Sequence, residues 1–276
     1  MKQEVLDFFK LSDDPFRLTP DLDFYFPSRS HTQILDILKY FFESNEAFAV
    51  VVGEVGCGKT MLIRMLLENI PENFETAVLI SPILQPKELI LAILYDLGVK
   101  TDSELNLDVL LRQFQDYLIQ LSQNGKRLAI IIDEAQDLPN ETLEQLRLLS
   151  NIETTKNKLM QILLVGQPEL NNKLSSYAMR QLRQRISIYE SLDQLSKQEA
   201  LHYILFRLSK VQKGDLSFTN VALKTIAKSS FGIPRLINTI CSRSLFIAYS
   251  LNTNRINFAI VKEALQSLNI KLRFGF

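Results

Sequence analysis

Residues 48–61 read Phe48-Ala-Val-Val-Val-Gly-Glu-Val-Gly-Cys-Gly-Lys-Thr-Met61, an apolar run that passes directly into a glycine-rich loop. The run Phe48–Val52 has the length and the β-branched content of a strand buried on both faces. The loop Gly53–Thr60 matches the phosphate-binding pattern G-x-x-x-x-G-K-[ST] at every fixed position, and a helix is expected from Met61. Because strand, loop and helix follow one another in the required order, a chance glycine turn is the less favoured interpretation.

The glycines of this loop let the backbone wrap around phosphate groups with its N–H groups pointing inward. The helix that follows adds the positive end of its dipole. Lys59 is expected to bridge the β- and γ-phosphates, and the Thr60 hydroxyl to hold Mg²⁺. The predicted cofactors are therefore ATP and Mg²⁺. The predicted nucleotide-binding residues of the loop are Gly53, Glu54, Val55, Gly56, Cys57, Gly58, Lys59, Thr60 and Met61.

A second apolar run, Leu128-Ala-Ile-Ile-Ile-Asp-Glu134, ends in two acids. An acid at the carboxyl end of a buried parallel strand points into the crevice where such sheets bind ligands. Asp133 is expected to hold Mg²⁺, usually through water, and Glu134 to act as the base that activates the attacking water. The alternative is a solvated helix cap, which the phosphate-binding loop upstream makes less favoured. A pair of acids favours hydrolysis over simple nucleotide holding.

A third apolar run, Leu163-Leu-Val-Gly-Gln-Pro168, places a glutamine where the strand ends. Gln167 is expected to contact the γ-phosphate or the attacking water as a sensor. The alternative is nearly as well supported, since Gly-Gln-Pro is itself a good turn sequence. Both interpretations stay open from the residues alone.

Two further sites carry cations. Arg180-Gln-Leu-Arg-Gln-Arg185 precedes the last predicted strand, either as a solvated basic face or with one arginine reaching a neighbouring subunit's γ-phosphate. Arg180, Arg183 and Arg185 are all candidates for that arginine finger. Arg235 lies in the first turn of a predicted helix, where a cation opposes the helix dipole at a cost of roughly 0.3–1 kcal/mol. A nucleotide phosphate is the natural compensating partner of Arg235, and an exposed arginine tolerated there is the alternative.

The rest of the chain alternates short β-branched runs with longer amphipathic segments, as in a parallel sheet flanked by helices. The predicted strands are 48–52, 76–80, 128–132, 162–165 and 186–189, and Thr101–Glu104 is expected to cap a helix. After Leu195 the strand signal stops, and helices are expected at about 196–210, 220–229, 234–249 and 258–268. The expected organisation is an α/β core with its N-terminal segment over residues 1–192 and an all-helical lid domain over 193–276.

Composition limits the class of protein. The 276 residues include 31 lysines and arginines against 31 aspartates and glutamates, so bulk charge gives no case for a dedicated nucleic-acid or polybasic membrane binder. Two cysteines are too few for a disulfide scaffold. No apolar run approaches the ~18–20 residues that span a bilayer. We expect a cytoplasmic protein.

Together these features resemble the AAA+ ATPases, and more closely the ExeA/GspA-like family of general secretion and type IV pilus ATPases, which includes MshM-like proteins. The stretch Phe8–His31 is similar to that family's opening signature. The other matching motifs are Gly53–Thr60, Asp133-Glu-Ala-Gln-Asp-Leu138, Leu146–Asn151, Gly166-Gln-Pro-Glu-Leu170, Gln184-Arg-Ile186 and Gly232-Ile-Pro-Arg-Leu-Ile-Asn238. The TniB/TnsC transposition regulators share the same ATPase core.

The resemblance implies a P-loop AAA+ (ASCE) core with a five-stranded parallel sheet, a helical lid, and ATP bound between the subunits of a ring or filament. It carries roles for Lys59, Thr60, Asp133, Glu134, Gln167, Arg185 and Arg235. It implies an ATPase that drives or switches a protein assembly linked to secretion, pilus or cell-surface export, with membrane contact only through a partner at the inner membrane. A DNA-associated regulator of the transposition type is the alternative, which the neutral charge makes less favoured.

Overall fold

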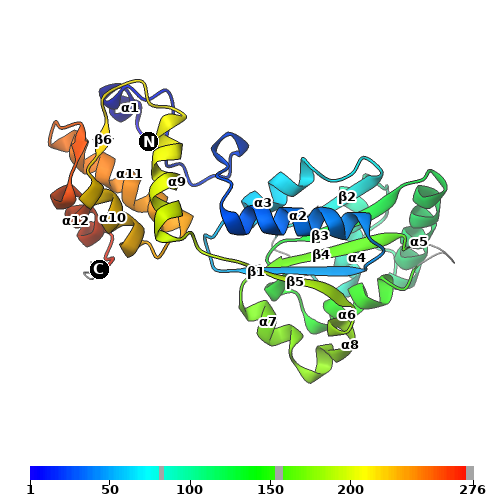
Figure 1. Cartoon of the computed structure of the whole chain (residues 1–276). Coiled ribbons are helices and arrows are strands. Elements are labelled where there is room, and N and C mark those ends of the chain that lie inside the picture. Colours follow the sequence, from blue (N-terminus) through cyan, green and yellow to red (C-terminus); the bar gives the residue numbers. More distant parts are fainter. Residues whose placement is uncertain (81–83, 153–157, 272–276) are drawn as a thin grey trace. The chain divides into compact units, whose positions relative to one another are not determined.

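The computed structural model describes residues 1–80, 84–152 and 158–271. Its main sheet has five parallel strands in the order β2-β3-β4-β1-β5 (Figure 1). The strands are β1 (Phe48–Gly53), β2 (Phe74–Leu79), β3 (Arg127–Ile132), β4 (Met160–Gly166) and β5 (Ile186–Leu192). All five coincide with the predicted strands to within three residues at each end, so the expected sheet is confirmed.

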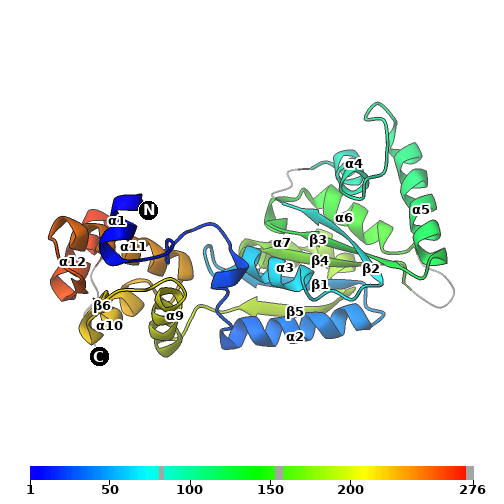
Figure 2. The ribbon, with the colours of Figure 1, turned by 90° about the horizontal axis from the view of Figure 1, so that it is seen from above.

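Burial explains why the three central strands could be predicted from the sequence. β1 and β4 are buried along their whole length and β3 along all but its first residue, as expected of strands covered on both faces. The two edge strands are less covered, and β5 alternates between partly buried and exposed residues before its buried last residue Leu192. Helices therefore pack on both sides of the sheet, which Figures 1 and 2 show.

The helices that connect these strands are α2 (Arg29–Glu43), α3 (Lys59–Leu67), α4 (Pro86–Asp96), α5 (Leu107–Gln123), α6 (Asn140–Leu149), α7 (Glu169–Leu174) and α8 (Arg180–Arg183). α5 begins later than the sequence suggested, because the side chain of Asn106 accepts the N–H of Val109 and caps it. The predicted cap at Thr101–Glu104 is therefore wrong, and Thr101 instead donates a hydrogen bond to Gln113 inside α5 (2.8 Å). In the described ranges no helix is both long and apolar enough to cross a membrane.

The chain divides into two compact units, each with its own hydrophobic core. The α/β unit comprises Ser30–Val55 and Leu62–Leu192, and the helical unit comprises Met1–Arg29, Gly56–Met61 and Asp193–Phe276. The N-terminal segment, which the sequence analysis grouped with the core, thus packs with the C-terminal helices. The last five residues expected in the lid, 272–276, lie outside the described residues.

The helical unit contains α1 (Gln3–Phe9), α9 (Lys197–Ser209), α10 (Asn220–Ser229), α11 (Pro234–Ser250) and α12 (Phe258–Ser267). Ser196 and Glu199 form a capping box at the start of α9, which agrees with the helix expected from about residue 196. The unit is not all-helical as expected, because β6 (Ser217–Phe218) pairs in parallel with β7 (Arg255–Ile256). Two-residue strands leave no periodicity in a sequence, which is why the prediction missed them.

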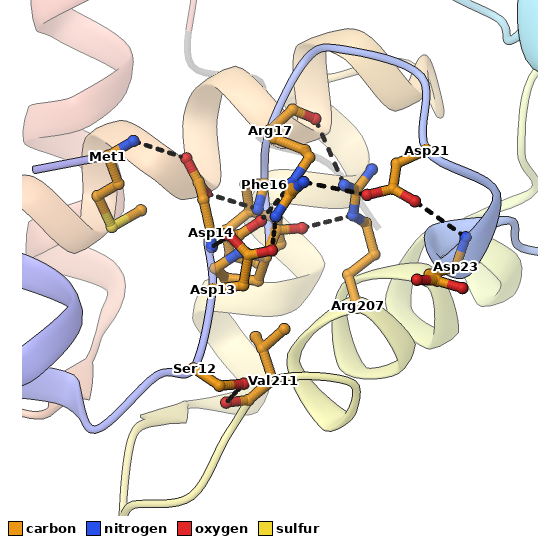
Figure 3. Close-up of polar contacts among 11 residues, drawn as sticks. Met1, Ser12, Asp13, Asp14, Phe16, Arg17, Asp21, Asp23, Arg207 and Val211 are labelled. Atoms are coloured by element: carbon orange, nitrogen blue, oxygen red, sulfur yellow. Dashed lines mark hydrogen bonds and ion pairs between the residues drawn. The ribbon is translucent and has the colours of Figure 1, made fainter. Parts of the chain in front are cut away.

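A buried arginine fastens the N-terminal segment to α9. Arg207 is 5% exposed, and its guanidinium donates to the Tyr203 hydroxyl (2.8 Å). The same guanidinium also donates to the carbonyls of Pro15 and Arg17, and Figure 3 shows how Arg207 and Arg17 lie. Arg17 forms ion pairs with Asp13 and Asp21, and the guanidiniums of Arg17 and Arg207 both lie over the ring of Phe24. Since a buried charge is costly without such partners, this network makes residues 12–24 an integral part of the helical unit.

Gly232, just before α11, offers a test of the packing around Leu195 in the helical unit. Its φ is +74°, and a Cβ there would lie 1.9 Å from the carbonyl oxygen of Leu195, whose own N–H donates to the carbonyl of Gly232 (2.9 Å). Gly232→Ala should therefore lower the free energy of unfolding by about 3 kcal/mol or more, from backbone strain plus displacement of Leu195. Urea unfolding followed by circular dichroism measures this loss.

Gly98→Ala is the matched control for that substitution. Gly98 also has a left-handed φ, +70°, but no atom lies within 4 Å of its built Cβ. Its cost should be limited to the backbone strain of about 1–2 kcal/mol. Equal losses for both variants would show that the contact with Leu195 does not matter.

Candidate active site

The sequence-predicted site residues follow three strands that lie side by side in the sheet. β3, β4 and β1 are consecutive in the strand order and parallel, so their carboxyl ends share one edge of the sheet. The phosphate-binding loop begins at the end of β1, the acid pair follows β3, and Gln167 follows β4. Open α/β sheets bind ligands outside this edge, which makes the edge the candidate active site.

The glycine-rich loop has the conformation that its pattern predicts. Gly56 and Gly58 have φ values of +82° and +105°, which side-chain-bearing residues rarely adopt. α3 begins at Lys59, so Lys59 and Thr60 lie in its first turn, where backbone N–H groups lack intrahelical acceptors and favour an anion. Cys57, between these two glycines, is buried.

Backbone hydrogen bonds hold the acid pair in place, and the second acid has an unusual backbone conformation. Asp133 is 2% exposed, its N–H donates to the carbonyl of Leu79 on β2 (2.9 Å), and its Oδ1 accepts the N–H of Glu134 (3.0 Å). Glu134 has a φ of +54°, a left-handed conformation that is strained for a residue with a side chain. Strain of this kind clusters at functional sites, where it fixes the direction of a side chain.

Glu134 and Gln167, predicted from separate motifs, are in direct contact. The side-chain Nε2 of Gln167 donates to Oε2 of Glu134 at 3.0 Å. A third residue, Gln136, also donates its Nε2 to the same oxygen at 2.9 Å. Sequence reasoning missed Gln136: it lies within the Asp133–Leu138 motif, but no residue pattern shows that its side chain turns back toward β4.

Arg185 is held near the C-terminus of α6. One guanidinium nitrogen of Arg185, Nη1, donates to the Arg147 carbonyl (3.2 Å) and to the buried Ser150 hydroxyl (2.8 Å). The carboxylate of Glu144 is nearby: its hydrogen bonds from Arg147 lower its pKa, and the charge of Arg185 adds to that effect. A helix C-terminus favours a cation, so Arg185 has a defined position and is still partly exposed.

The other two candidate cations of that stretch differ from Arg185. Arg180 donates to the Tyr177 hydroxyl and lies 4.5 Å from the centroid of the same ring, and Arg183 is exposed. The three arginines therefore do not form one patch of equivalent residues.

Arg235 lies in the first turn of α11, directly after Pro234. It is exposed, and within the helical unit its backbone N–H donates to the carbonyl of Gly56 at 3.3 Å. The predicted first-turn cation is thus next to a residue of the phosphate-binding loop.

Comparisons with known proteins agree with the fold described above. The model of the family described as "AAA domain" matches residues 43–174. General secretion pathway protein A of Aeromonas hydrophila is 39% identical over 249 residues, which are 90% of this chain and 46% of that protein. The chain thus spans about half the length of this relative.

Two solved structures show the same fold at lower identity. Cdc6p from Pyrobaculum aerophilum superposes with a TM-score of 0.73 at 18% identity, covering 96% of this chain and 73% of its own. The RuvB Holliday junction branch migration motor of Thermotoga maritima superposes with a TM-score of 0.63 at 21% identity, covering 93% and 74%. The chain therefore has the fold of AAA+ P-loop ATPases, matches the AAA domain model over residues 43–174, and is similar over most of its length to General secretion pathway protein A.

Proposed function

We propose that this chain binds ATP with Mg²⁺ at the carboxyl edge of its sheet and hydrolyses it. The observation that carries the proposal is the contact of Glu134 with Gln167 at the carboxyl ends of β3 and β4, in the same sheet as β1, after which the phosphate-binding loop begins. Such loops bind nucleotides in many proteins, but a loop alone supplies no base. A carboxylate held at the same edge provides one.

The residues present fit the proposed cofactors. Two left-handed glycines and the start of α3 suit a phosphate chain. The Thr60 hydroxyl and the Asp133 carboxylate are hard oxygen donors of the kind that Mg²⁺ prefers. When bound, Mg²⁺ would neutralise part of the phosphate charge.

The chain's own residues then divide the work of hydrolysis. Lys59 binds the β- and γ-phosphates, Glu134 accepts the proton of the attacking water, and Gln167 orients that water or reads the γ-phosphate. Arg235 compensates phosphate charge from α11. Arg185 of a neighbouring copy stabilises the charge that develops in the transition state.

The partners of this activity are proposed from the resemblance. A site completed by a neighbour's arginine implies a homo-oligomer, either a ring or a filament. The 39% identity with General secretion pathway protein A supports a role in driving or switching a secretion- or pilus-type protein assembly. We place the chain in the cytoplasm, peripheral to the inner membrane through a partner.

Phosphate release at increasing chain concentration tests this proposal. If Arg185 completes the site of a neighbouring copy, the rate per chain should rise with concentration as copies assemble, and reach a plateau. Arg185→Ala should stay near the low rate of the unassembled wild type at every concentration, and should lie roughly 10³-fold or more below the wild type at the plateau. Absence of phosphate release by the wild type at all concentrations would overturn the proposal.

The alternative, a DNA-associated regulator, gains support from charge distribution. Residues 193–276 hold twelve lysines and arginines against four aspartates and glutamates, although the whole chain is neutral. Filter binding of duplex DNA at two salt concentrations separates the two functions. A DNA binder should retain DNA at low salt and lose it steeply at higher salt, and absence of retention at low salt would remove this alternative.

A further inference from the structure

Gln136 closes a ring of hydrogen bonds between the ends of β3 and β4. Its Nε2 donates to Oε2 of Glu134 (2.9 Å), and its Oε1 accepts the backbone N–H of Gln167 (2.9 Å). Gln167 completes the ring with its own Nε2, which donates to the same Oε2 of Glu134 (3.0 Å). One carboxylate oxygen is thus held by amides from two different segments of the chain.

The orientation of the Gln136 amide follows from its partners. A backbone N–H can only donate, so the atom facing the N–H of Gln167 must be the amide oxygen. The amide nitrogen then faces two carboxylates, Glu134 and Asp137, the latter at 3.2 Å. Every contact of the side chain pairs a donor with an acceptor, so that the flipped amide would put like groups together at three places.

A glycine leaves the space for this amide. A Cβ built on Gly166 would lie 2.9 Å from Oε1 of Gln136 and 3.0 Å from Leu170. Gly166 does not have a left-handed φ, so an alanine there would meet no backbone strain. Its lack of a side chain therefore serves the close approach of Gln136.

Lys173 of α7 fixes the backbone that carries Gln136. Its ammonium group donates to the carbonyls of Gln136 and Leu138, both at 2.6 Å. These carbonyls belong to the turn that follows Glu134 and precedes α6. Lys173 of α7 thus holds the backbone of this turn, and the N–H of Gln167, which follows β4, holds the side chain of Gln136.

We propose that Gln136 is a positioning residue for the carboxylate of Glu134, with Lys173 holding the turn from which it acts. The inference rests on the hydrolysis proposed above. Gln136 needs no contact with ATP in this role, because it acts by fixing the direction of the group that activates water. Holding a catalytic group within a fraction of an ångström matters, since a misplacement of about 1 Å can cost roughly 10²-fold in rate.

The first test compares Gln136→Ala with Gln136→Glu and with Gln115→Ala on the exposed surface of α5. Gln136→Ala should lower kcat roughly 10–10²-fold and leave KM for ATP within about twofold, because ground-state binding does not use this contact. Gln136→Glu keeps the length and volume of the side chain but replaces the donor with an acceptor, so kcat should fall at least as far. Gln115→Ala should match the wild type.

A mere packing role predicts a different result. If Gln136 only fills space, Gln136→Glu should retain the wild-type kcat, which would overturn the proposal. Thermal melting of each variant checks folding. A wild type that releases phosphate while Gln136→Ala equals Gln115→Ala overturns this inference alone, whereas a wild type that binds ATP without releasing phosphate overturns the proposed function and the inference with it.

Gly166→Ala supplies a second, independent variant. It should lower kcat by displacing the Gln136 amide, and it should add little, within about twofold, when introduced into Gln136→Ala, since the displaced group is then absent. Fully multiplicative losses in the double variant would show that Gly166 and Gln136 do not act together, and would contradict the ring as the means of positioning.

Discussion

Lys59→Ala should abolish the binding of ATP by this chain, whereas Glu134→Gln should bind ATP as tightly as the wild type and hydrolyse it roughly 10²–10⁴-fold more slowly. The difference follows from where each charge acts. Lys59 meets phosphates that are already charged in the ground state, so its loss weakens binding itself. Glu134 acts on the water during the reaction, so its amide analogue keeps the shape of the site and loses the base.

Isothermal calorimetry with ATP and a phosphate-release assay measure the two effects separately. Lys39→Ala and Glu43→Gln, both on the exposed surface of α2, are the matched controls and should behave as the wild type. Equal losses of ATP affinity in Lys59→Ala and Glu134→Gln would contradict the roles assigned to these two residues.

A mixture of Arg185→Ala and Glu134→Gln should hydrolyse ATP faster than either variant alone. Each variant should be nearly inactive for a different reason. Glu134→Gln lacks the base, and Arg185→Ala lacks an arginine finger, which is worth roughly 10³–10⁵ in rate. Random co-assembly of equal amounts brings an intact Glu134 and an intact Arg185 together at about a quarter of the interfaces, if interfaces act independently. The mixture should therefore recover about a quarter of the wild-type rate in a phosphate-release assay.

Light scattering is the control for that mixture. If the two variants co-assemble and the mixture stays inactive, Arg185 does not act on a neighbour's site, and Arg183 or Arg180 becomes the candidate. The structure gives Arg185 the strongest case, because Ser150 and the carbonyl of Arg147 hold its guanidinium in place.

The three central strands of the sheet were predictable because they are covered on both faces. Runs such as Phe48–Val52 and Leu128–Ile132 must be continuously apolar to be buried in a parallel sheet, and that constraint is visible in the sequence. Element ends were less predictable. Asn106 caps α5 in place of Thr101–Glu104 because both stretches offer suitable side chains, and tertiary contacts decide which of them is used.

Residues of the candidate site could be predicted where their proposed role is to meet a phosphate, a metal ion or water. The glycines, Lys59 and the acid pair stand at fixed spacings for that reason. Gln136 could not be found in this way, because its role depends on the close approach of two loops that are about 30 residues apart in sequence. The packing of residues 12–24 against Arg207 was hidden for the same reason, since it joins segments about 190 residues apart.

The nucleotide that stays on the chain after exposure to ATP tests the central claim most directly. The wild type, Glu134→Gln and Lys59→Ala are each incubated with ATP and Mg²⁺, desalted rapidly, and their bound nucleotide is identified by ion-exchange chromatography. The account predicts ADP on the wild type, ATP on Glu134→Gln and no nucleotide on Lys59→Ala. ATP alone on the wild type, or as much ADP on Glu134→Gln as on the wild type, would contradict hydrolysis by Glu134 at this site.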